Sequence, residues 1–349
     1  MRDMRSFCIR LNEWAGREKI RRRTAFALCM LLFLTGCARL EKEEETKSIR
    51  IGVSLYRGDD TFINNIRGEL EKRAKEYEQE YGVKVTLDIQ DAKGSQNTQN
   101  DQVERFLSLG CDVLCINPVD RTAASGIIDK AMAAETPVIF FNREPVNEDM
   151  ERWDQLYYVG AEAKESAVLQ GSIVVERYRE DPDSLDLNGD GVISYVLLEG
   201  ESSHQDSLIR TEWSVQTLKD ADIPIEKITG GIANWERSQA SALMEQWLEK
   251  YSGAIELVIC NNDDMALGAI DAMEREEVSG ISVVGIDGTA PGLEAVENGK
   301  LMGTVACDLE DYAGAVFGIA VDKAMGQDIR PEIELEDGKY HRCPWKIVE

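Results

Sequence analysis

The chain has 349 residues, and its 65 Asp and Glu against 39 Lys and Arg give a formal net charge of −26. A chain this acidic repels nucleic acid and anionic lipid, so the charge disfavours both as partners and favours a neutral ligand. The length is sufficient for two domains.

Residues 1–36 have the pattern of a bacterial export signal. A cationic segment at 21–23 precedes an apolar run at 24–34 that is too short to span a bilayer. The following Leu-Thr-Gly-Cys at 34–37 resembles a bacterial lipobox, which implies cleavage after Gly36 and lipidation of Cys37. The alternative is an uncleaved membrane anchor, which the small Thr-Gly pair disfavours. We therefore expect a signal peptide at 1–36, a tether at 37–48 and an extracytoplasmic protein held at the membrane by lipidated Cys37.

The eight cysteines do not predict a disulfide framework. Cys8 and Cys29 leave with the signal peptide, and Cys37 carries the lipid. An odd number then remains, namely Cys111, Cys115, Cys260, Cys307 and Cys343. Several of them flank or end apolar runs, so we expect most to be packed as apolar side chains. No CxxC pair or Cys/His cluster indicates a zinc site.

From Ser48 onward, short apolar runs alternate with amphipathic segments. The predicted strands are 51–55, 83–87, 113–116, 138–141, 195–198, 257–259, 283–286 and 304–306. The predicted helices include 64–78, 102–109, 166–179, 208–219, 240–250 and 265–274. This repeated order is typical of an α/β fold with parallel sheets and right-handed crossovers. The length predicts two similar lobes, and the absence of a GxGxxG or Walker sequence gives no support for nucleotide chemistry.

The segment at 186–194 begins like an EF-hand calcium loop, with acidic or amide residues at alternate positions and Gly191 in register. The expected ligands are the side chains of Asp186, Asn188 and Asp190, the carbonyl of Val192, and an oxygen or bridging water at Ser194. The twelfth position, where a bidentate Glu belongs, is Leu197, so a carboxylate must come from elsewhere in the chain. The alternative is a polar turn without an ion.

A predicted strand at 195–198 is followed by His204, Asp206 and Arg210. Ligands of parallel α/β sheets bind beyond the carboxyl ends of the strands. Asp206 can accept hydrogen bonds from hydroxyls, and Arg210 can donate to ring or hydroxyl oxygens. The alternative is a helix capped by Asp206 with an Asp–Arg pair on its surface.

Polar residues also follow five other predicted strands at the same edge. They include Asp60, Asn117, Asn142, Asn262 and Asp287. Each alone could cap the next helix, but together they predict a cleft with fixed hydrogen-bond partners for a polyhydroxylated ligand. Phe62 and Trp235 lie in segments next to this edge and could stack on the C–H faces of a sugar ring; the alternative for each is a place in the core.

These motifs resemble the type I periplasmic binding proteins, and among them the D-galactose/D-glucose receptors of sugar ABC transporters. The resemblance covers residues from about 49 to 307. Its specific elements are Asp59-Asp60-Thr61-Phe62, Asn261-Asn262-Asp263, the calcium loop, and the spacing His204-x-Asp206-x-x-x-Arg210.

The resemblance implies two Rossmann-like lobes joined by a three-crossing hinge. The expected N-terminal lobe is 49–142 plus 308–335, and the expected C-terminal lobe is 143–307 plus 336–349. Phe62 and Trp235 would sandwich a pyranose, and Asp60 would bind the hydroxyl at carbon 4. The remaining sugar oxygens would be bound by Asn117, His204, Asp206, Arg210, Asn262 and Asp287. Glu256 would supply the distant carboxylate of a structural Ca²⁺ site.

One departure from the family stands at Cys307, where the resemblance expects a sugar-binding Asn. A thiol is a poor donor and acceptor, so the preference between glucose and galactose is open. The expected function is binding of D-galactose or D-glucose by hinge closure, in a monomer that delivers the sugar to a membrane permease. The alternatives are a sensor that signals to a membrane histidine kinase or chemoreceptor, and an enzyme in which His204 and Asp206 act as acid and base. The resemblance disfavours the enzyme and implies no catalytic residue.

Overall fold

The computed structural model describes residues 48–349 except Ser252. The predicted signal peptide, nearly all of the predicted tether, and Cys37 lie outside the described residues. Residues 48–349 form one compact unit. Within it, every helix is too short or too polar to cross a bilayer.

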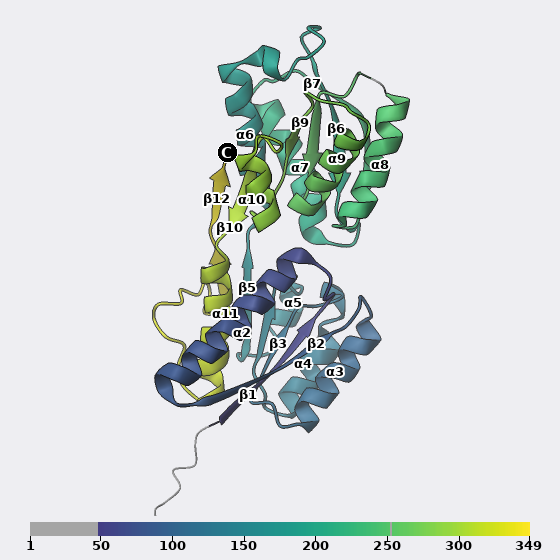
Figure 1. Ribbon diagram of the computed structural model, residues 1–349. Coiled ribbons are helices and arrows are strands. Elements are labelled where there is room, and N and C mark those ends of the chain that lie inside the picture. The colour runs from purple at the N-terminus through teal and green to yellow at the C-terminus, as the bar shows by residue number, and fades with distance from the viewer. Residues whose placement is uncertain (1–47, 252) are drawn as a thin grey trace, which may run out of the picture. The chain divides into compact units, whose positions relative to one another are not determined.

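The first lobe is built on a six-stranded parallel sheet with the order β11-β5-β4-β3-β1-β2 (Figure 1). Its strands are β1 (Ser48–Leu55), β2 (Lys84–Asp91), β3 (Val113–Ile116), β4 (Val138–Phe141), β5 (Leu156–Ala161) and β11 (Tyr340–Cys343). The inner strands β3 and β4 are apolar throughout because both faces of the sheet are covered.

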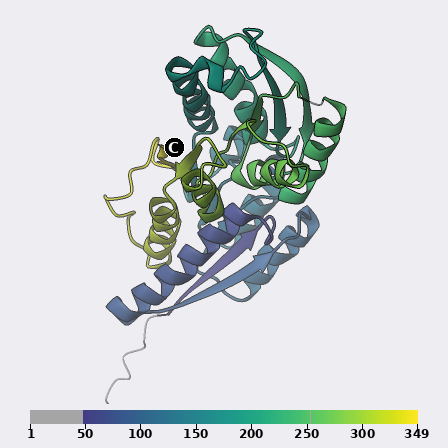
Figure 2. The ribbon, with the colours of Figure 1, turned by 45° about the horizontal axis from the view of Figure 1, so that its top comes forward.

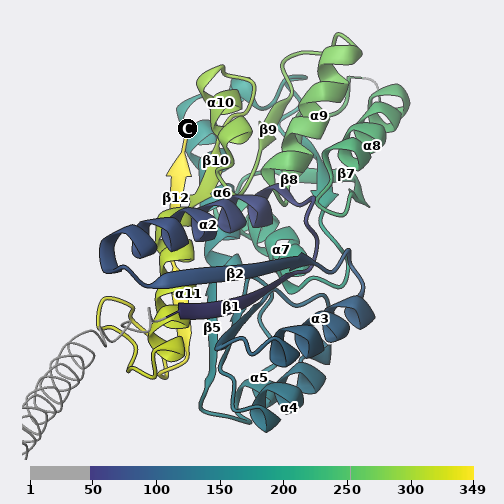
Figure 3. The same cartoon turned by 60° about the horizontal axis from the view of Figure 1, so that its bottom comes forward.

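Alternate residues of these strands face different helices. Val113 and Ile139 belong to the core shared with α2 (Thr61–Tyr81) and α11 (Leu309–Ala324). Leu114 and Phe140 belong to the core under α3 (Gln96–Ser108) and α4 (Ser125–Ala133). Figure 3 shows α2 and α11 on one side of β1 and β2 and α3 and α4 on the other. The short helix α5 (Asn147–Met150) precedes β5.

The second lobe contains a four-stranded parallel sheet with the order β7-β6-β8-β9. Its strands are β6 (Ile193–Glu199), β7 (Ile225–Ile232), β8 (Leu257–Cys260) and β9 (Ser282–Val284). Parallel bridges join the end of β9 to the segment of β10 (Thr304–Cys307), which pairs antiparallel with β12 (Trp345–Val348). The chain therefore ends in the second lobe (Figures 1 and 2).

Helices cover both faces of the second sheet as well. Leu197 of β6 packs toward α6 (Ala163–Glu180) and α7 (Gln205–Asp220), whereas its neighbour Leu198 packs toward α8 (Arg237–Lys250) and α9 (Asp263–Arg275). The remaining helical elements are α10 (Ala290–Glu297) and the 3₁₀ turns η1 (Arg121–Ala123) and η2 (Pro182–Ser184). The predicted α/β fold of two parallel-sheet lobes is confirmed.

The chain passes between the lobes after β5, after β10, and between β11 and β12. Two of the predicted lobe boundaries are therefore wrong. The first boundary lies after Ala161 and not after Asn142, because β5 pairs with β4 inside the first sheet. The predicted second-lobe segment 336–349 is divided, because β11 pairs with β5 and only β12 joins the second lobe.

Candidate ligand-binding site

A small cavity of about 40 Å³ lies where side chains of the two lobes meet. It is lined by Tyr56, Asp60, Phe62, Ile63, Asn142, His204, Asp206, Arg210, Trp235, Asn262 and Asp287. All the predicted sugar-binding residues except Asn117 are therefore brought together. Asn142, which the sequence placed at the edge of the cleft, lines the cavity as well, and so do Tyr56 and Ile63, which the sequence did not single out.

Asp60 holds the wall of the first lobe in place. It is the N-cap of α2, and its Oδ1 accepts a hydrogen bond of 2.9 Å from the backbone N–H of Ile63. Its Oδ2 accepts a 2.5 Å hydrogen bond from the Tyr56 hydroxyl. The lone pairs left over remain available to a ligand hydroxyl. Phe62, in the first turn of the same helix, packs edge-on against Tyr312 with ring centroids 5.9 Å apart.

Tyr56 is fixed from its other side by Arg143, whose guanidinium lies 3.8 Å from the centre of the Tyr56 ring. Burial and the nearby Asp60 carboxylate raise the pKa of Tyr56 well above its ordinary value. Tyr56 therefore stays protonated and donates to Asp60.

Asn117 supports the cavity wall instead of lining it. It is fully buried, and its Oδ1 accepts from the backbone N–H of Tyr56 at 3.3 Å. Its Nδ2 donates to the carbonyl of Phe141 at 3.2 Å and to Oδ1 of Asn142 at 3.1 Å. In this arrangement Asn117 uses its amide to position Tyr56 and Asn142, two residues that do line the cavity, and its direct contact with a ligand stays a prediction.

His204 caps the helix that carries the second lobe's polar wall. Its Nδ1 accepts a 3.1 Å hydrogen bond from the backbone N–H of Asp206, so the predicted cap Asp206 lies instead in the first turn of α7. Because Nδ1 is an acceptor, Nε2 carries the proton of the neutral ring and is a donor. Burial, together with Arg143 and Arg210, lowers the pKa of His204 well below its ordinary value. The imidazole is therefore neutral at pH 7.

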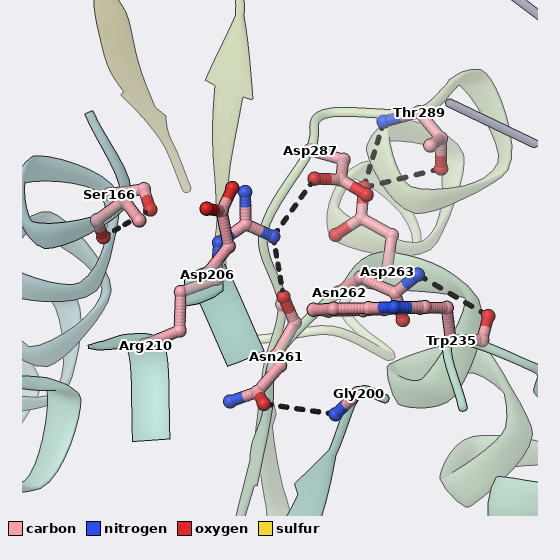
Figure 4. Close-up of polar contacts among 12 residues, drawn as sticks. Ser166, Gly200, Asp206, Arg210, Trp235, Asn261, Asn262, Asp263, Asp287 and Thr289 are labelled. Carbon is pink, nitrogen blue, oxygen red and sulfur yellow. Dashed lines mark hydrogen bonds and ion pairs between the residues drawn. The ribbon is translucent and has the colours of Figure 1, made fainter. Parts of the chain in front are cut away.

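Arg210 lies one turn further along α7 and is only 6% exposed. One of its terminal nitrogens donates to the carbonyl of Asn261 at 2.8 Å and to Oδ1 of Asp287 at 3.3 Å (Figure 4). The alternative of a surface Asp–Arg pair is therefore wrong, because Arg210 is buried and its partner is Asp287. The Nε of Arg210 has no hydrogen-bond partner among the described residues. A buried donor without a partner is the kind of group that a polar ligand satisfies.

The carboxylates of the second lobe have unusual proton affinities. Burial raises the pKa of Asp287 well above its ordinary value, and Arg210 opposes this effect. Burial also raises the pKa of Asp206, with Arg210 and Arg143 opposing it. Such perturbed groups in a cleft are typical of functional sites.

Trp235 reaches the cavity through a strained turn. Asn234 and Trp235 have φ values of 53° and 67°, which non-glycine residues adopt infrequently. The Trp235 ring packs over Gly200, where an added Cβ would lie 2.2 Å from the ring, and its edge meets His204 with centroids 5.2 Å apart. Asn262, the N-cap of α9, donates through Nδ2 to the Trp235 carbonyl at 3.4 Å. Figure 4 shows the Trp235 ring edge-on and the bond from the Asn262 amide to the Trp235 carbonyl.

Polar contacts join the lobes around the cavity. Arg143 donates to Glu201 at 2.7 Å, and Thr61 donates to Asp264 at 2.5 Å. Arg57 lies 3.2 Å from Glu236. These contacts hold the two lobes together beside the site. Next to the site, a larger cavity of about 980 Å³ shares Tyr56, His204 and Asp206 with it.

The predicted calcium loop is wound around its own acidic side chains. Asp186 accepts three backbone N–H groups, those of Gly189, Asp190 and Gly191, at 2.9 to 3.2 Å. Gly189 and Gly191 have φ values of 73° and 84°, which explains the glycines. Further side-chain oxygens accept along the loop: Asn188 from Asp190 at 2.8 Å and Asp190 from Val192 at 2.9 Å.

Glu256 closes this loop from the second sheet. Only 1% of Glu256 is exposed, and its two oxygens accept from the backbone N–H groups of Asn188 at 3.1 Å and Ser194 at 2.7 Å. Within the part of the chain that the structure describes, no cationic side chain is bonded to this buried carboxylate, and further oxygen ligands lie beside it. Such a group fits a hard divalent cation. The residues present therefore fit a calcium ion, with Glu256 in the place of the missing twelfth ligand.

The comparisons with known proteins agree with this architecture. The periplasmic binding protein domain matches residues 51–328. The chain belongs to the periplasmic binding protein family. It is 36% identical over 303 residues to the D-galactose/methyl-galactoside binding periplasmic protein of Haemophilus influenzae, a match covering 86% of this chain and 89% of the relative. It is 26% identical over 302 residues to a xylitol-binding protein of Mycolicibacterium smegmatis, covering 86% and 79% of the two chains.

A solved structure gives the same picture. An ABC transporter solute binding protein from Bacillus halodurans, crystallised with myo-inositol, matches with a TM-score of 0.70 and 30% identity. The match covers 87% of this chain and 96% of the other. Family membership makes this periplasmic binding protein an extracytoplasmic solute receptor and not an enzyme.

Proposed function

We propose that this periplasmic binding protein binds a neutral hexose, D-galactose or D-glucose, in the cavity between its lobes and presents it to an ABC permease. The observation that carries the proposal is the composition of the cavity wall. Carboxylates, two amides and a guanidinium lie there together with the rings of Phe62 and Trp235. The relative from Haemophilus influenzae supports a galactose-type ligand.

Each group has a task in sugar binding. Asp60, Asp206 and Asp287 accept hydrogen bonds from sugar hydroxyls, and charge-assisted bonds of this kind are stronger than neutral ones. Arg210 donates, and so does the Nε2–H of neutral His204. Phe62 from one lobe and Trp235 from the other pack against the apolar C–H faces of the ring. A ligand held in this way contacts both lobes at once.

Binding is coupled to movement of the lobes. The cavity volume of about 40 Å³ corresponds to on the order of three water molecules, so a hexose needs somewhat more space than this arrangement leaves. The lobes therefore open to admit the sugar and close around it, and the contacts with both lobes favour the closed form. A permease can then distinguish the loaded receptor by its shape.

A calcium ion at the loop has a structural task in this proposal. Asp186, Asn188, Asp190, Glu256, the carbonyl of Val192 and an oxygen at Ser194 would hold it. When bound, it neutralises the carboxylates and ties the loop to the start of β8. Lipidation of Cys37 would keep the receptor near the permease.

Titration calorimetry on a chain that begins at Ala38 tests the proposal, since residues 48–349 form a compact unit of their own. The panel is D-galactose, D-glucose, D-ribose and myo-inositol, each with calcium and with chelator. We expect one-to-one binding of a hexose and no heat from ribose. If only myo-inositol binds, the ligand is a cyclitol and not a hexose. If none of the four compounds gives heat of binding, the proposal is refuted.

A further inference from the structure

A cluster of metal-binding side chains lies in the first lobe, outside the candidate sugar and calcium sites. Among the residues that the structure describes, Asp311, His341 and Cys343 bring their ligand atoms within 4.8 Å of one another. Asp311 is in the first turn of α11, and the other two residues are on β11. His341 and Cys343 are buried, with 8% and 1% exposure.

The hydrogen bonds of His341 determine which of its nitrogens can bind a cation. Its Nδ1 lies 3.0 Å from the backbone carbonyl of Glu334, which can only accept, so Nδ1 carries a proton. In the neutral ring, Nε2 then has a lone pair, and this nitrogen lies 2.9 Å from Oδ2 of Asp311. A lone pair and a carboxylate oxygen at this distance require a cation between them, either a proton or a metal ion. An imidazole N–H bonded to a backbone carbonyl is the usual support of a metal-binding His.

The surroundings favour a divalent cation. An open cavity of about 400 Å³ beside the cluster is lined by four further carboxylates, those of Asp308, Glu332, Glu334 and Glu336. The guanidinium in the same wall, Arg342, is engaged by a bidentate pair with Glu144 at 2.7 and 3.1 Å. The local field therefore attracts cations, and the cavity gives them a route to Asp311 and His341.

We propose that Asp311, His341 and Cys343 form a site for a thiolate-binding divalent cation, with Zn²⁺ as the ion and water as a fourth ligand. Sulfur, imidazole and carboxylate ligands together select zinc over calcium or magnesium. Tetrahedral Zn²⁺ places its nitrogen and oxygen ligands about 3.3 Å apart, so the observed 2.9 Å needs only a small adjustment.

The site lies beside the hinge. α11 begins directly after the second crossing, and β11 ends directly before the third, at Pro344. An ion bound there ties the two elements together and stabilises the folded first lobe, because it binds the native arrangement only.

Cobalt spectroscopy tests the site. Chelator-treated protein beginning at Ala38 is titrated with Co²⁺ in excess Ca²⁺, which keeps the calcium loop filled, and Zn²⁺ is then added as competitor. The readout is the thiolate-to-cobalt charge-transfer absorption. Cys343→Ala, His341→Ala and Asp311→Asn are compared with Cys115→Ala, a control with the same 1% exposure in the same sheet.

We expect one equivalent of Co²⁺, a thiolate band that Zn²⁺ removes, and at least about tenfold weaker binding in each site variant. Cys115→Ala should bind like the unchanged chain. Absence of the thiolate band, or equal affinity in Cys343→Ala and Cys115→Ala, would overturn the site and leave an imidazolium–carboxylate pair. The Asp311 side chain is 40% exposed, so Asp311→Asn tests the site even where a buried variant fails to fold.

Discussion

The buried pair of Arg210 and Asp287 gives the sharpest test of the cavity wall. Both residues are 6% exposed, and their 3.3 Å contact is accompanied by the 2.8 Å bond from Arg210 to the Asn261 carbonyl. Replacing Arg210 by Met leaves the Asp287 carboxylate buried without its cation. Breaking a buried pair in this way costs about 3–5 kcal/mol of folding free energy. Asp287→Asn keeps the shape but removes the charge, and should cost about 1–3 kcal/mol.

The double variant decides whether these costs come from one interaction. With both changes present, no uncompensated charge remains, so the total should fall short of the sum of the single costs by at least about 1 kcal/mol. Urea unfolding at pH 7 measures the three free energies. Arg67→Met, which breaks an exposed pair with Glu71 at 3.0 Å, is the control and should cost less than about 0.5 kcal/mol. Additive costs for Arg210→Met and Asp287→Asn would refute the pairing.

Three further predictions concern the sugar, the ion and pH. Trp235→Ala should weaken hexose binding by about 2 kcal/mol or more, roughly 30-fold, because a buried aromatic contact is lost. The control Trp213→Ala, on α7, should leave hexose binding unchanged in calorimetry. Equal losses in the two variants would contradict a special role for Trp235. Calcium at a thousandfold excess over its Kd should stabilise the unchanged chain by about 4 kcal/mol and raise its melting temperature. Glu256→Gln should abolish this rise. An undiminished rise in the variant would show that Glu256 is not a calcium ligand. Burial raises the pKa of Asp263 from 3.8 to about 6, so the folded state binds this proton more tightly than the unfolded state does. The Asp263 proton therefore contributes about 3 kcal/mol to the free energy of unfolding. This contribution is fully present below about pH 4 and is lost as the pH rises through about 6. Urea unfolding from pH 4 to 7.5 should show a loss that is about 3 kcal/mol larger in the unchanged chain than in Asp263→Asn, because other buried carboxylates titrate in both, and parallel curves for the two would argue against it.

Much of the fold could be predicted because strands such as β3, β4 and β8 are buried on both faces and read as uninterrupted apolar runs. All the strands predicted from such runs are present in the structure. Four strands were not predicted, namely β5, β7, β11 and β12. Among them, β7 is an edge strand in which Lys227, Gly230 and Gly231 interrupt the apolar pattern. The two lobe-boundary errors have a related cause. β5 was not predicted as a strand, β11 pairs with β5 far away in the sequence, and no local pattern reports which sheet a strand joins.

The candidate site was predictable to the extent that polar residues follow strand ends. Parallel strands bring their carboxyl ends to one edge of each sheet, and these edges of the two sheets face each other across the cavity. Asp60 follows a strand of the first sheet, and Asp206 and Asp287 follow strands of the second. The position of a polar residue after a strand does not show whether its side chain points into the cavity. Asn117 follows its strand like the others, yet it turns toward the backbone of Tyr56 and Phe141.

Contacts between residues far apart in the chain could not be predicted from the sequence either. Glu256 meets the calcium loop across 68 residues at Asn188, and only the family resemblance suggested it. Asp311 meets His341 across 30 residues, so the spacing of cysteines and histidines gave no sign of a metal-binding cluster. Such meetings depend on how α11 and β11 pack, which is a property of the folded chain.

Small-angle X-ray scattering with and without D-galactose, or with whichever hexose calorimetry shows to bind, tests the central claim most directly. The claim is that the sugar binds between the lobes and holds them together. It predicts a smaller radius of gyration at saturating sugar in the unchanged chain, and no change in Trp235→Ala at the same concentration when binding is lost. An unchanged radius of gyration in a sample that calorimetry shows to be saturated would contradict the account, because the sugar would then occupy one lobe without closing the hinge.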